Sequence, residues 1–315
     1  MRIILVPVFF AAALLASGCD GGNQADRGRS GEGEGEGERH TELSASLGVV
    51  CALKSTGALT CWGALREFDN VLPPAGDFYA EVSVGDDHAC ARRKDGTVTC
   101  WGVNLSGQSE APEGTFKAVS AGHEKTCGLR TDGSLFCWGD PFHDVEPPAA
   151  GTFVEVSVGN GSACALNERG EAVCWGTPGT QEYLSNNVFR AIEAPSEEYH
   201  GLDIFAEYAC ALRVDDSIRC WGWSNEVDVS AAPVGSFVQV STGSLHACAL
   251  DIDGRVTCWG DNTFHQLDVP DEVQGRVISV AVAGYATCAV TAVDTKDDVV
   301  CWGDNEVAFN LPADL

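Results

Sequence analysis

The chain has 315 residues and a formal net charge of −27 at pH 7, from 19 Lys and Arg against 46 Asp and Glu. Nucleic-acid binding needs a concentrated positive field and no basic run occurs, so the composition excludes DNA or RNA as a direct partner and disfavours an anionic membrane surface. The acidic residues, such as Asp86-Asp87 and Asp297-Asp298, are interpreted as solubilising charge; calcium sites in the loops are the alternative, but carboxylates are too sparse to assign a metal.

Residues 1–18 are predicted to be a signal peptide. The apolar run 3–15 is too short to span a bilayer but has the length of a signal-peptide core. It ends in Ala16-Ser17-Gly18-Cys19, which resembles the bacterial lipobox. That resemblance implies cleavage before Cys19 and lipidation of this cysteine. An ordinary signal peptide followed by an unrelated cysteine is the alternative.

Residues 19–41 are predicted to be a lipidated cysteine followed by a tether. The segment is rich in Gly and Glu, which alternate from Gly31 to Glu38, and it contains almost nothing apolar. Such a segment cannot bury a core and is expected to be disordered. As a random coil it would span about 25–30 Å. We interpret it as a spacer between the lipid and the folded domain, residues 42–315.

The folded domain carries a sevenfold repeat in which a cysteine is followed by a second one in Cys-Trp-Gly. The first cysteines of successive repeats lie 37 to 46 residues apart. Short runs with alternating polarity, separated by turn glycines, favour strands, and a period near 40 residues is typical of propeller blades. The pairs are Cys51 and Cys61, Cys90 and Cys100, Cys127 and Cys137, Cys164 and Cys174, Cys210 and Cys220, Cys248 and Cys258, and Cys288 and Cys301.

The spacing within the pairs predicts hairpins. Six pairs are ten positions apart, which places Cys90 opposite Cys100 around a three-residue loop, with Gly96 in the left-handed conformation. Glycine recurs at this place in four other repeats, but Asp216 occupies it in the fifth and must accept a positive φ. The last pair is thirteen apart and needs a longer tip around residues 294–298.

Cysteines that face each other across a hairpin are within bridging distance, so we predict seven disulfides that pin the inner hairpin of each blade. Zinc binding usually needs Cys-x-x-Cys pairs, which are absent, and reduced buried thiols are the remaining alternative. Disulfides require an oxidising compartment. The cysteines therefore indicate export independently of the signal peptide.

The repeat resembles that of the regulator of chromosome condensation family. The resemblance is carried by Gly85-Asp86-Asp87-His88-Ala89-Cys90-Ala91, by the stretch from Asp95 to Asn104, and by a second copy from Gly243 to Leu267. It implies an all-β, seven-bladed β-propeller with four-stranded antiparallel blades. The cysteine pairs look like those of exported bacterial members, so the nuclear family's nucleotide exchange and chromatin contacts are not expected here.

The repeated residues are predicted to be scaffold. The tryptophans can bury their rings between blades, and His88, Ser162 and His246, at matching places, are expected to bond local backbone. The connections after Cys-Trp-Gly vary, and their aromatic residues predict a partner-binding rim on one face, although some can instead pack inward. The rim residues are Phe68, Phe142, His143, Tyr183, Trp223, Phe264 and His265.

The sequence favours a non-enzymatic binding or scaffold module, lipid-anchored in the cell envelope on the periplasmic side or at the cell surface. No nucleophile with a nearby base and no phosphate loop is evident. The expected partner is a protein or a surface polysaccharide, and we expect no cofactor and a monomer. The alternatives are a secreted inhibitor, by resemblance to the β-lactamase inhibitor built on this propeller, and an extracellular enzyme.

Overall fold

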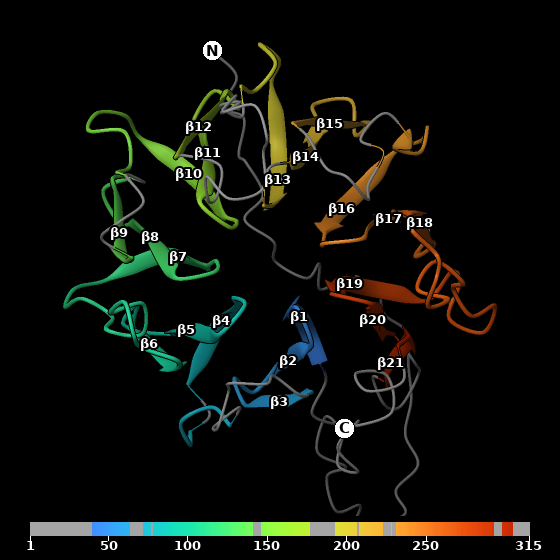
Figure 1. The fold of residues 1–315 in the computed structure, drawn as a ribbon, viewed down its shortest axis with the longest axis horizontal. Helices are drawn as coiled ribbons and strands as arrows, with labels where there is room; N and C mark the ends of the chain where they lie inside the picture. The colour runs from blue at the N-terminus through green and yellow to red at the C-terminus, as the bar shows by residue number, and fades with distance from the viewer. Residues whose placement is uncertain are drawn as a thin grey trace, which may run out of the picture.

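The chain forms a ring of seven antiparallel β-sheets (Figure 1). The computed structural model describes residues 40–63, 72–76, 78–140, 146–176, 193–206, 208–222, 228, 231–292 and 298–304. Each sheet consists of three consecutive strands, and the sheets follow one another around a central axis in chain order. The predicted all-β propeller with one blade per repeat is therefore confirmed. The predicted signal peptide and Cys19 lie outside the described residues.

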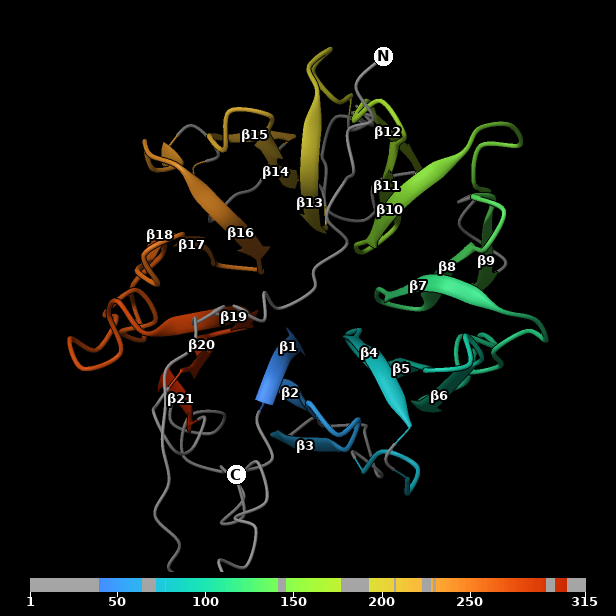
Figure 2. The same cartoon turned by 180° about the vertical axis from the view of Figure 1, so that it is seen from behind.

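The first strand of each sheet lies next to the axis, as Figure 2 shows from the opposite side. These strands are β1 (His40–Ser46), β4 (Tyr79–Val84), β7 (Phe116–Ala121), β10 (Phe153–Val158), β13 (Tyr199–Phe205), β16 (Phe237–Thr242) and β19 (Val277–Ala283).

The second and third strands of each sheet form the hairpin that carries the cysteines. The second strands are β2 (Val49–Lys54), β5 (His88–Arg93), β8 (Lys125–Arg130), β11 (Ser162–Asn167), β14 (Tyr208–Arg213), β17 (His246–Asp251) and β20 (Ala286–Thr291). The third strands are β3 (Leu59–Gly63), β6 (Val98–Gly102), β9 (Leu135–Gly139), β12 (Ala172–Gly176), β15 (Ile218–Gly222), β18 (Val256–Gly260) and β21 (Asp298–Gly303).

The described sheets have three strands rather than the expected four. Two connections that would carry a fourth strand, residues 103–115 and 261–276, are described in full, and both consist of turns and irregular backbone. Their backbone is used differently, since the carbonyls of Gln108 and Gln266 accept hydrogen bonds from the next blade. Most of the other connections lie wholly or partly outside the described residues, where the fourth strand stays a prediction.

The predicted hairpin register is confirmed. Each first cysteine lies directly opposite its partner, and all seven pairs are bonded with Cα atoms 4.0–4.1 Å apart. The glycines of the three-residue loops have positive φ, as at Gly96 (88°), and Asp216 takes their place at 65°. The tip of the seventh hairpin, residues 293–297, lies outside the described residues.

The expected place of the disulfides in the blade is wrong. They were predicted on the inner hairpin, but they join the second and third strands, and a further strand separates them from the axis. The reason is that each repeat begins with an additional strand that carries no cysteine. This first strand pairs with the second through a bulge near its start, as between Tyr79 and Glu81.

The hydrophobic core is divided among the interfaces between neighbouring sheets. Leu53 and Cys61 of the first sheet, for example, pack with Tyr79, Val82 and Trp101 of the second. An isolated three-stranded sheet could not cover both faces, so each blade depends on its neighbours. The repeated tryptophans Trp62, Trp101, Trp221, Trp259 and Trp302 are buried in these interfaces.

The ring closes by packing of the first sheet against the seventh. Val50 and Trp62 share a core cluster with Ala283, Cys288 and Val299. The backbone N–H of Leu43 also donates to Ser279 Oγ at 3.3 Å. In the described residues each sheet is built from one repeat, so neither end of the chain contributes a strand to the other end's sheet.

Candidate binding site: the central channel and its mouth

A channel of about 280 Å³ lies on the axis of the ring, lined by the first strands of all seven sheets. Each first strand is the edge strand of its sheet, so part of its backbone N–H groups have no ladder partner. Alternate side chains of these strands point toward the channel, as strand geometry requires. Polar side chains that line the channel therefore bond these backbone N–H groups first, and only their remaining hydrogen-bonding capacity is available to a ligand.

One layer of channel residues consists mainly of serines that bond the next blade. Ser44 Oγ accepts the backbone N–H of Val84 at 2.9 Å, and the same contact recurs at Ser83, Ser120, Ser157 and Ser241. In the fifth sheet Asp203 replaces the serine, and its Oδ2 accepts the Thr242 N–H at 2.7 Å. These hydrogen bonds link consecutive blades around the ring, which gives the Val-x-Val pattern a structural role.

A second layer uses longer side chains for the same purpose. Glu81 Oε1 accepts the Val119 N–H at 3.2 Å, and Glu155 Oε1 accepts the Leu202 N–H at 2.8 Å. Gln239 occupies the matching place in the sixth sheet and bonds both the N–H and the carbonyl of Val280. The carboxylates of this layer are therefore structural acceptors, and Arg92 compensates one of them through a 2.8 Å ion pair with Glu81.

Burial raises the pKa of the channel carboxyl groups. Desolvation raises the pKa of Glu42 to about 8, with a contribution from the negative charge of Glu81. Desolvation likewise raises the pKa of Glu155 to about 7 and raises that of Asp203. The charged forms of these groups are disfavoured because water is partly excluded and few cations are near. Near neutral pH the channel interior therefore carries less negative charge than its composition implies.

The mouth of the channel is formed by the turns between first and second strands. Gly85, Gly122 and Gly159 lie where the turns of adjacent blades touch: a Cβ on Gly85 would come within 2.1 Å of the Gly122 carbonyl oxygen. The residue after each of these glycines differs between blades and lines the channel: Asp86, His123 and Asn160. The close contact thus fixes the backbone, while the next side chain is free to vary.

Three blades contribute to one polar cluster at this mouth. Ser46 Oγ donates to Asp86 Oδ1 at 2.7 Å, and Asp86 Oδ2 lies 3.0 Å from His123 Nδ1. The hydrogen bond to Asp86 raises the pKa of His123. Asp86 is buried, whereas the His123 side chain keeps 40% of its surface exposed. Since the aspartate lies between the serine and the histidine, no hydroxyl is placed for activation by the imidazole.

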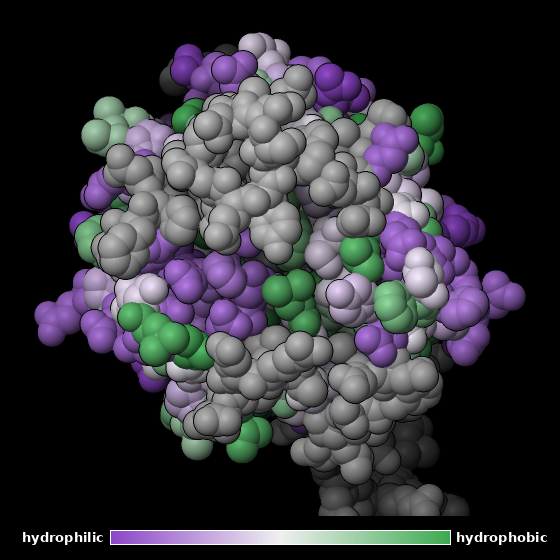
Figure 3. Space-filling model, viewed as in Figure 1, coloured by the Kyte–Doolittle hydropathy of each residue, from purple (hydrophilic) through white to green (hydrophobic). Residues whose placement is uncertain are grey.

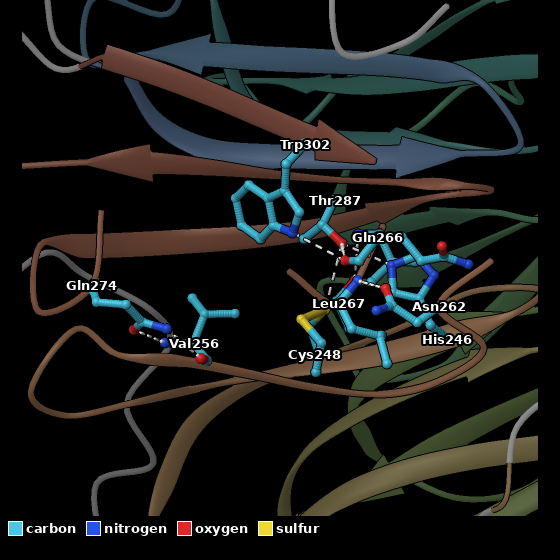
Figure 4. Close-up of a disulfide and its surroundings, with 12 residues drawn as sticks. His246, Cys248, Val256, Asn262, Gln266, Leu267, Gln274, Thr287 and Trp302 are labelled. Carbon is cyan, nitrogen blue, oxygen red and sulfur yellow. Dashed lines mark hydrogen bonds between the residues drawn. A yellow bond between two sulfur atoms is a disulfide. The ribbon is translucent and has the colours of Figure 1, made fainter. Parts of the chain in front are cut away.

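The tryptophans and glutamines form a repeated junction between blades. Trp302 Nε1 and Thr287 Oγ1 both donate to the backbone carbonyl of Gln266, at 3.0 Å each, as Figure 4 shows. Trp138 and Thr126 make the same contacts with the Gln108 carbonyl. The indole N–H groups of Trp62, Trp175, Trp221 and Trp259 have no partner among the described residues, and the connections that would supply the equivalent carbonyl lie wholly or partly outside them.

The two repeated histidines belong to the same junction. His246 Nε2 lies 2.8 Å from Thr287 Oγ1, and His88 Nε2 lies 2.6 Å from Thr126 Oγ1. Because each threonine hydroxyl donates its proton to a glutamine carbonyl, Nε2 must be the donor to the hydroxyl. Desolvation lowers the pKa of both histidines to about 4, so they are neutral.

The expected local backbone bond is therefore wrong for both histidines, which bond a side chain of the next blade. It holds in part for Ser162, whose Oγ donates to a backbone carbonyl, but that carbonyl belongs to Ala206 of the next blade. All three residues are buried at blade junctions. Their positions are those of scaffold residues.

Two of the predicted rim residues, Phe264 and His265, are described, and both are exposed. Phe264 keeps 43% of its surface accessible and packs against Tyr285 with ring centroids 4.9 Å apart. His265 has a φ of 63° and bonds Asp268 through Nδ1 at 2.8 Å. The other predicted rim residues lie outside the described residues: Phe68, Phe142, His143, Tyr183 and Trp223.

The sequence-based prediction of the rim missed Tyr285 and Leu47. Both lie in turns between first and second strands rather than in the connections, and their side chains remain partly exposed. A Cβ on Gly284 would come within 3.3 Å of Leu47, so the two turns are in contact across the closure of the ring. An apolar residue in a turn where other repeats have Asp, His or Asn is the sequence signal that could have identified them.

The described residues contain no cluster of three or more His, Cys, Asp or Glu side chains that could hold a metal ion. Within the same part of the chain, no helix has the length and apolar character needed to cross a membrane.

Three segments of the chain match the regulator of chromosome condensation (RCC1) repeat: residues 79–108, 116–143 and 237–266. They cover the second, third and sixth repeats, including the His88 and His246 junctions. These three segments are RCC1 repeats. The chain's seven cysteine-paired blades extend the matched segments around the whole ring.

Solved structures share the fold of this chain. The CRINKLY WD40 ectodomain of the receptor kinase ACR4 from Arabidopsis thaliana is 28% identical over 69% of this chain and 78% of that one, with a TM-score of 0.57. The entire ectodomain of the receptor kinase CR4 from Physcomitrella patens is 25% identical, with 70% and 60% covered and a TM-score of 0.56.

Prp20p from Saccharomyces cerevisiae has 17% identity over 86% of this chain and 84% of that one, with a TM-score of 0.60. At this identity the likeness concerns the fold alone. No curated protein matches this chain.

Proposed function

We propose that this protein is an exported, lipid-anchored propeller that binds a protein partner through the mouth of its channel and the adjoining connections, without catalysing a reaction. The observation that carries the proposal is that the polar residues inside the channel and those at its mouth have different roles. Polar groups inside the channel bond the next blade, whereas the residues at the mouth differ from blade to blade, and two of them, His123 and Asn160, remain accessible. Variable residues on a rigid scaffold are where binding function is expected.

The exposed aromatic pair supports a protein partner. Phe264 and Tyr285 pack against each other and are partly exposed, and aromatic residues are favoured anchors in protein interfaces. His265 holds a positive φ where Gly107 stands in the second repeat. Backbone strain of this kind tends to persist at functional sites.

The disulfides are the evidence for the compartment in which the protein folds. Seven disulfides indicate an oxidising, extracellular or exported location. The propellers of two receptor-kinase ectodomains, at 28% and 25% identity, are consistent with an exposed binding role. Lipidation of Cys19 would hold the propeller at a membrane through the Gly- and Glu-rich segment.

Binding is tested by affinity capture from intact cells after reversible cross-linking. The wild-type chain is compared with a Trp223→Ala/Phe264→Ala double variant and with Val214→Ala, a control on the tip of the fifth cysteine hairpin. We expect the double variant to lose one stoichiometric protein partner that Val214→Ala retains. An unchanged set of partners would refute binding through this surface.

Anchoring is tested separately by Cys19→Ser. The variant is expected to leave the membrane fraction and appear in the soluble fraction, while the seven disulfides still form. If it remained with the membranes, the lipid anchor would be wrong, but binding through the mouth would not be affected.

A further inference from the structure

The chain contains a single Asn-Gly dipeptide, Asn160-Gly161. It lies in the turn between β10 and β11, and Asn160 lines the mouth of the channel. The Asn160 side chain is exposed, and Gly161 has a φ of 78°. Glycine adopts this conformation without strain and has no side chain to shield its own backbone nitrogen. The dipeptide is therefore the place in the chain where an asparagine side chain is most open to attack by the next backbone nitrogen.

Asn160 differs from the other described asparagines in its hydrogen bonding. Asn104, Asn167 and Asn262 each donate through Nδ2 to a carboxylate and accept a backbone N–H through Oδ1, at 2.7–3.1 Å. Among the described residues, the Asn160 amide has no partner on either atom. Its side chain can therefore rotate toward its own backbone without breaking a bond, whereas the other three amides are held at both ends.

The backbone nitrogen that would attack Asn160 is unengaged as well. In the described part of the chain no acceptor takes the Gly161 N–H, because the turn is closed by a different bond, from the Gly159 N–H to the Ser162 carbonyl at 2.8 Å. A backbone N–H that is already bonded must lose that bond before its nitrogen can react. At Gly161 this cost is absent.

The Asp-Gly dipeptides of the hairpin tips provide an internal comparison, since aspartate can undergo the same ring closure. In Asp95-Gly96 the glycine N–H donates to the Arg93 carbonyl at 2.9 Å, and Asp95 Oδ1 accepts both the N–H and the hydroxyl of Thr97. The dipeptide at 132–133 repeats all three bonds, and the glycine N–H at 253–254 is bonded in the same way. Both reacting groups are thus held apart at the tips, but neither is held at Asn160-Gly161.

The flanks of the turn are fixed by the neighbouring backbone. A Cβ on Gly159 would lie 2.9 Å from the backbone nitrogen of Ala206 in the next blade, and the Ser162 hydroxyl donates to the Ala206 carbonyl. Since Gly159 and Ser162 are buried while Asn160 is exposed, the ring holds the turn in place and leaves its tip open to water.

We propose that Asn160 is a site of spontaneous deamidation through a cyclic imide formed with Gly161. The Gly161 nitrogen bonds to Asn160 Cγ and gives its proton to water, while the bond from Cγ to Nδ2 breaks and this nitrogen leaves as ammonia. One water molecule then opens the imide. It yields aspartate where it releases the Gly161 nitrogen from Cγ, and isoaspartate where it releases that nitrogen from the main-chain carbonyl carbon. An amide and water become a carboxylate and ammonium, so no oxidant, reductant or cofactor is needed. Proximity of the two groups in one turn favours the closure.

The reaction adds a negative charge to the mouth of the channel. Asn160 lines a small hollow together with His123, Lys125 and Asp140 of the preceding blade. A carboxylate at this place favours the imidazolium form of His123, whose pKa the hydrogen bond to Asp86 already raises. On the side of the ring seen in Figure 3, the hydrophobic residues of the described part occur as small separate groups among hydrophilic ones. On a surface so divided, one added charge changes the local chemistry.

The test incubates the purified full chain, with its disulfides intact, at neutral pH beside a synthetic peptide of residues 156–163. Proteolytic fragments are then analysed by mass spectrometry, with isoaspartate detected by enzymatic methylation. We expect Asn160 to convert at a rate within about tenfold of the peptide's, with isoaspartate among the products. Asn104, Asn167 and Asn262 of the same sample should remain intact.

Two variants accompany the wild type. Asn160→Gln keeps an amide at this position but needs a larger ring to react, so conversion should stop while the disulfides still form. Asn160→Asp carries the charge of the product, and an NMR titration should find the pKa of His123 raised further in it.

An Asn160 that stays intact in the folded chain while the peptide converts would overturn the inference, as would equal conversion at the three bonded asparagines. Formation of aspartate without isoaspartate would exclude the imide route. These results leave the proposed binding function untouched, because the inference concerns the chemistry of Asn160 and Gly161 alone.

Discussion

Replacing Glu155 with Gln tests whether the channel carboxylates serve the scaffold. Glu155 Oε1 accepts the Leu202 N–H, a bond that a glutamine oxygen can also accept. The same arrangement already exists in the sixth sheet, where Gln239 bonds Val280 through both its oxygen and its nitrogen. The substitution therefore removes a buried charge and keeps the contact between blades.

The magnitude follows from the pKa of Glu155, which burial raises from its ordinary value of 4.5 to about 7. Each unit of pKa is worth about 1.4 kcal/mol, so the upper limit is about 3 kcal/mol. The carboxyl faces a channel that water can enter, and screening reduces the expected effect to about 1–2 kcal/mol. Because the folded-state pKa is raised, the contribution to stability is complete below pH 4.5 and is lost as the pH rises through 7.

The assay is urea unfolding of the disulfide-intact protein at intervals from pH 4.5 to 8.5. We expect Glu155→Gln to match the wild type at pH 4.5 and to be more stable by about 1–2 kcal/mol at pH 8. The control is Glu198→Gln, since Glu198 is exposed and its replacement should leave the curve unchanged. Parallel curves for wild type and Glu155→Gln would refute the argument that burial disfavours this charge.

Three further substitutions test separate parts of the fold. Replacing Cys127 and Cys137 with alanine opens a loop of sequence separation 10 and should lower the free energy of unfolding by about 3 kcal/mol in urea titrations; a loss below about 1 kcal/mol would contradict a stabilising role. His265→Gly should raise the free energy of unfolding by up to about 1 kcal/mol, and Gly107→Ala should lower it by a similar amount, because both positions have positive φ. Thermal melts in which both variants shift in the same direction would argue against backbone strain at these positions. Ser279→Ala removes the hydrogen bond to Leu43 at the closure of the ring and should cost about 1 kcal/mol, whereas an equally stable variant would show that packing alone closes it.

The hairpins and disulfides could be predicted from the sequence because their determinants are local. A ten-residue spacing with glycine near its centre defines both the register and the turn, and Asp216 at a φ of 65° shows that even the exception was predictable. The family resemblance then implied the number of blades. The repeat did not indicate which strand faces the axis, because the Val-x-Val-Gly pattern does not show whether its side chains point toward the axis or away from it.

The contacts between blades could not be predicted because they join residues about 40 positions apart. His246 reaches Thr287 and Ser46 reaches Asp86 only in the closed ring, so a local pattern suggested a backbone bond instead. The rim was predicted from aromatic residues in the connections, but two further exposed apolar residues, Leu47 and Tyr285, lie in turns. Contacts between turns of different blades depend on the assembled ring, and the sequence period does not encode them.

The central claim is that the mouth of the channel and the adjoining connections bind a protein partner. It is tested most directly by placing a photo-cross-linking amino acid at position 264, and separately at position 252 on a hairpin tip of the opposite face, in the full chain in living cells. The account predicts a discrete protein adduct from position 264, reduced by Tyr285→Ala, which removes the ring that packs beside this position, and no equivalent adduct from position 252. Adducts of equal yield at both positions, or an adduct at position 252 alone, would contradict it.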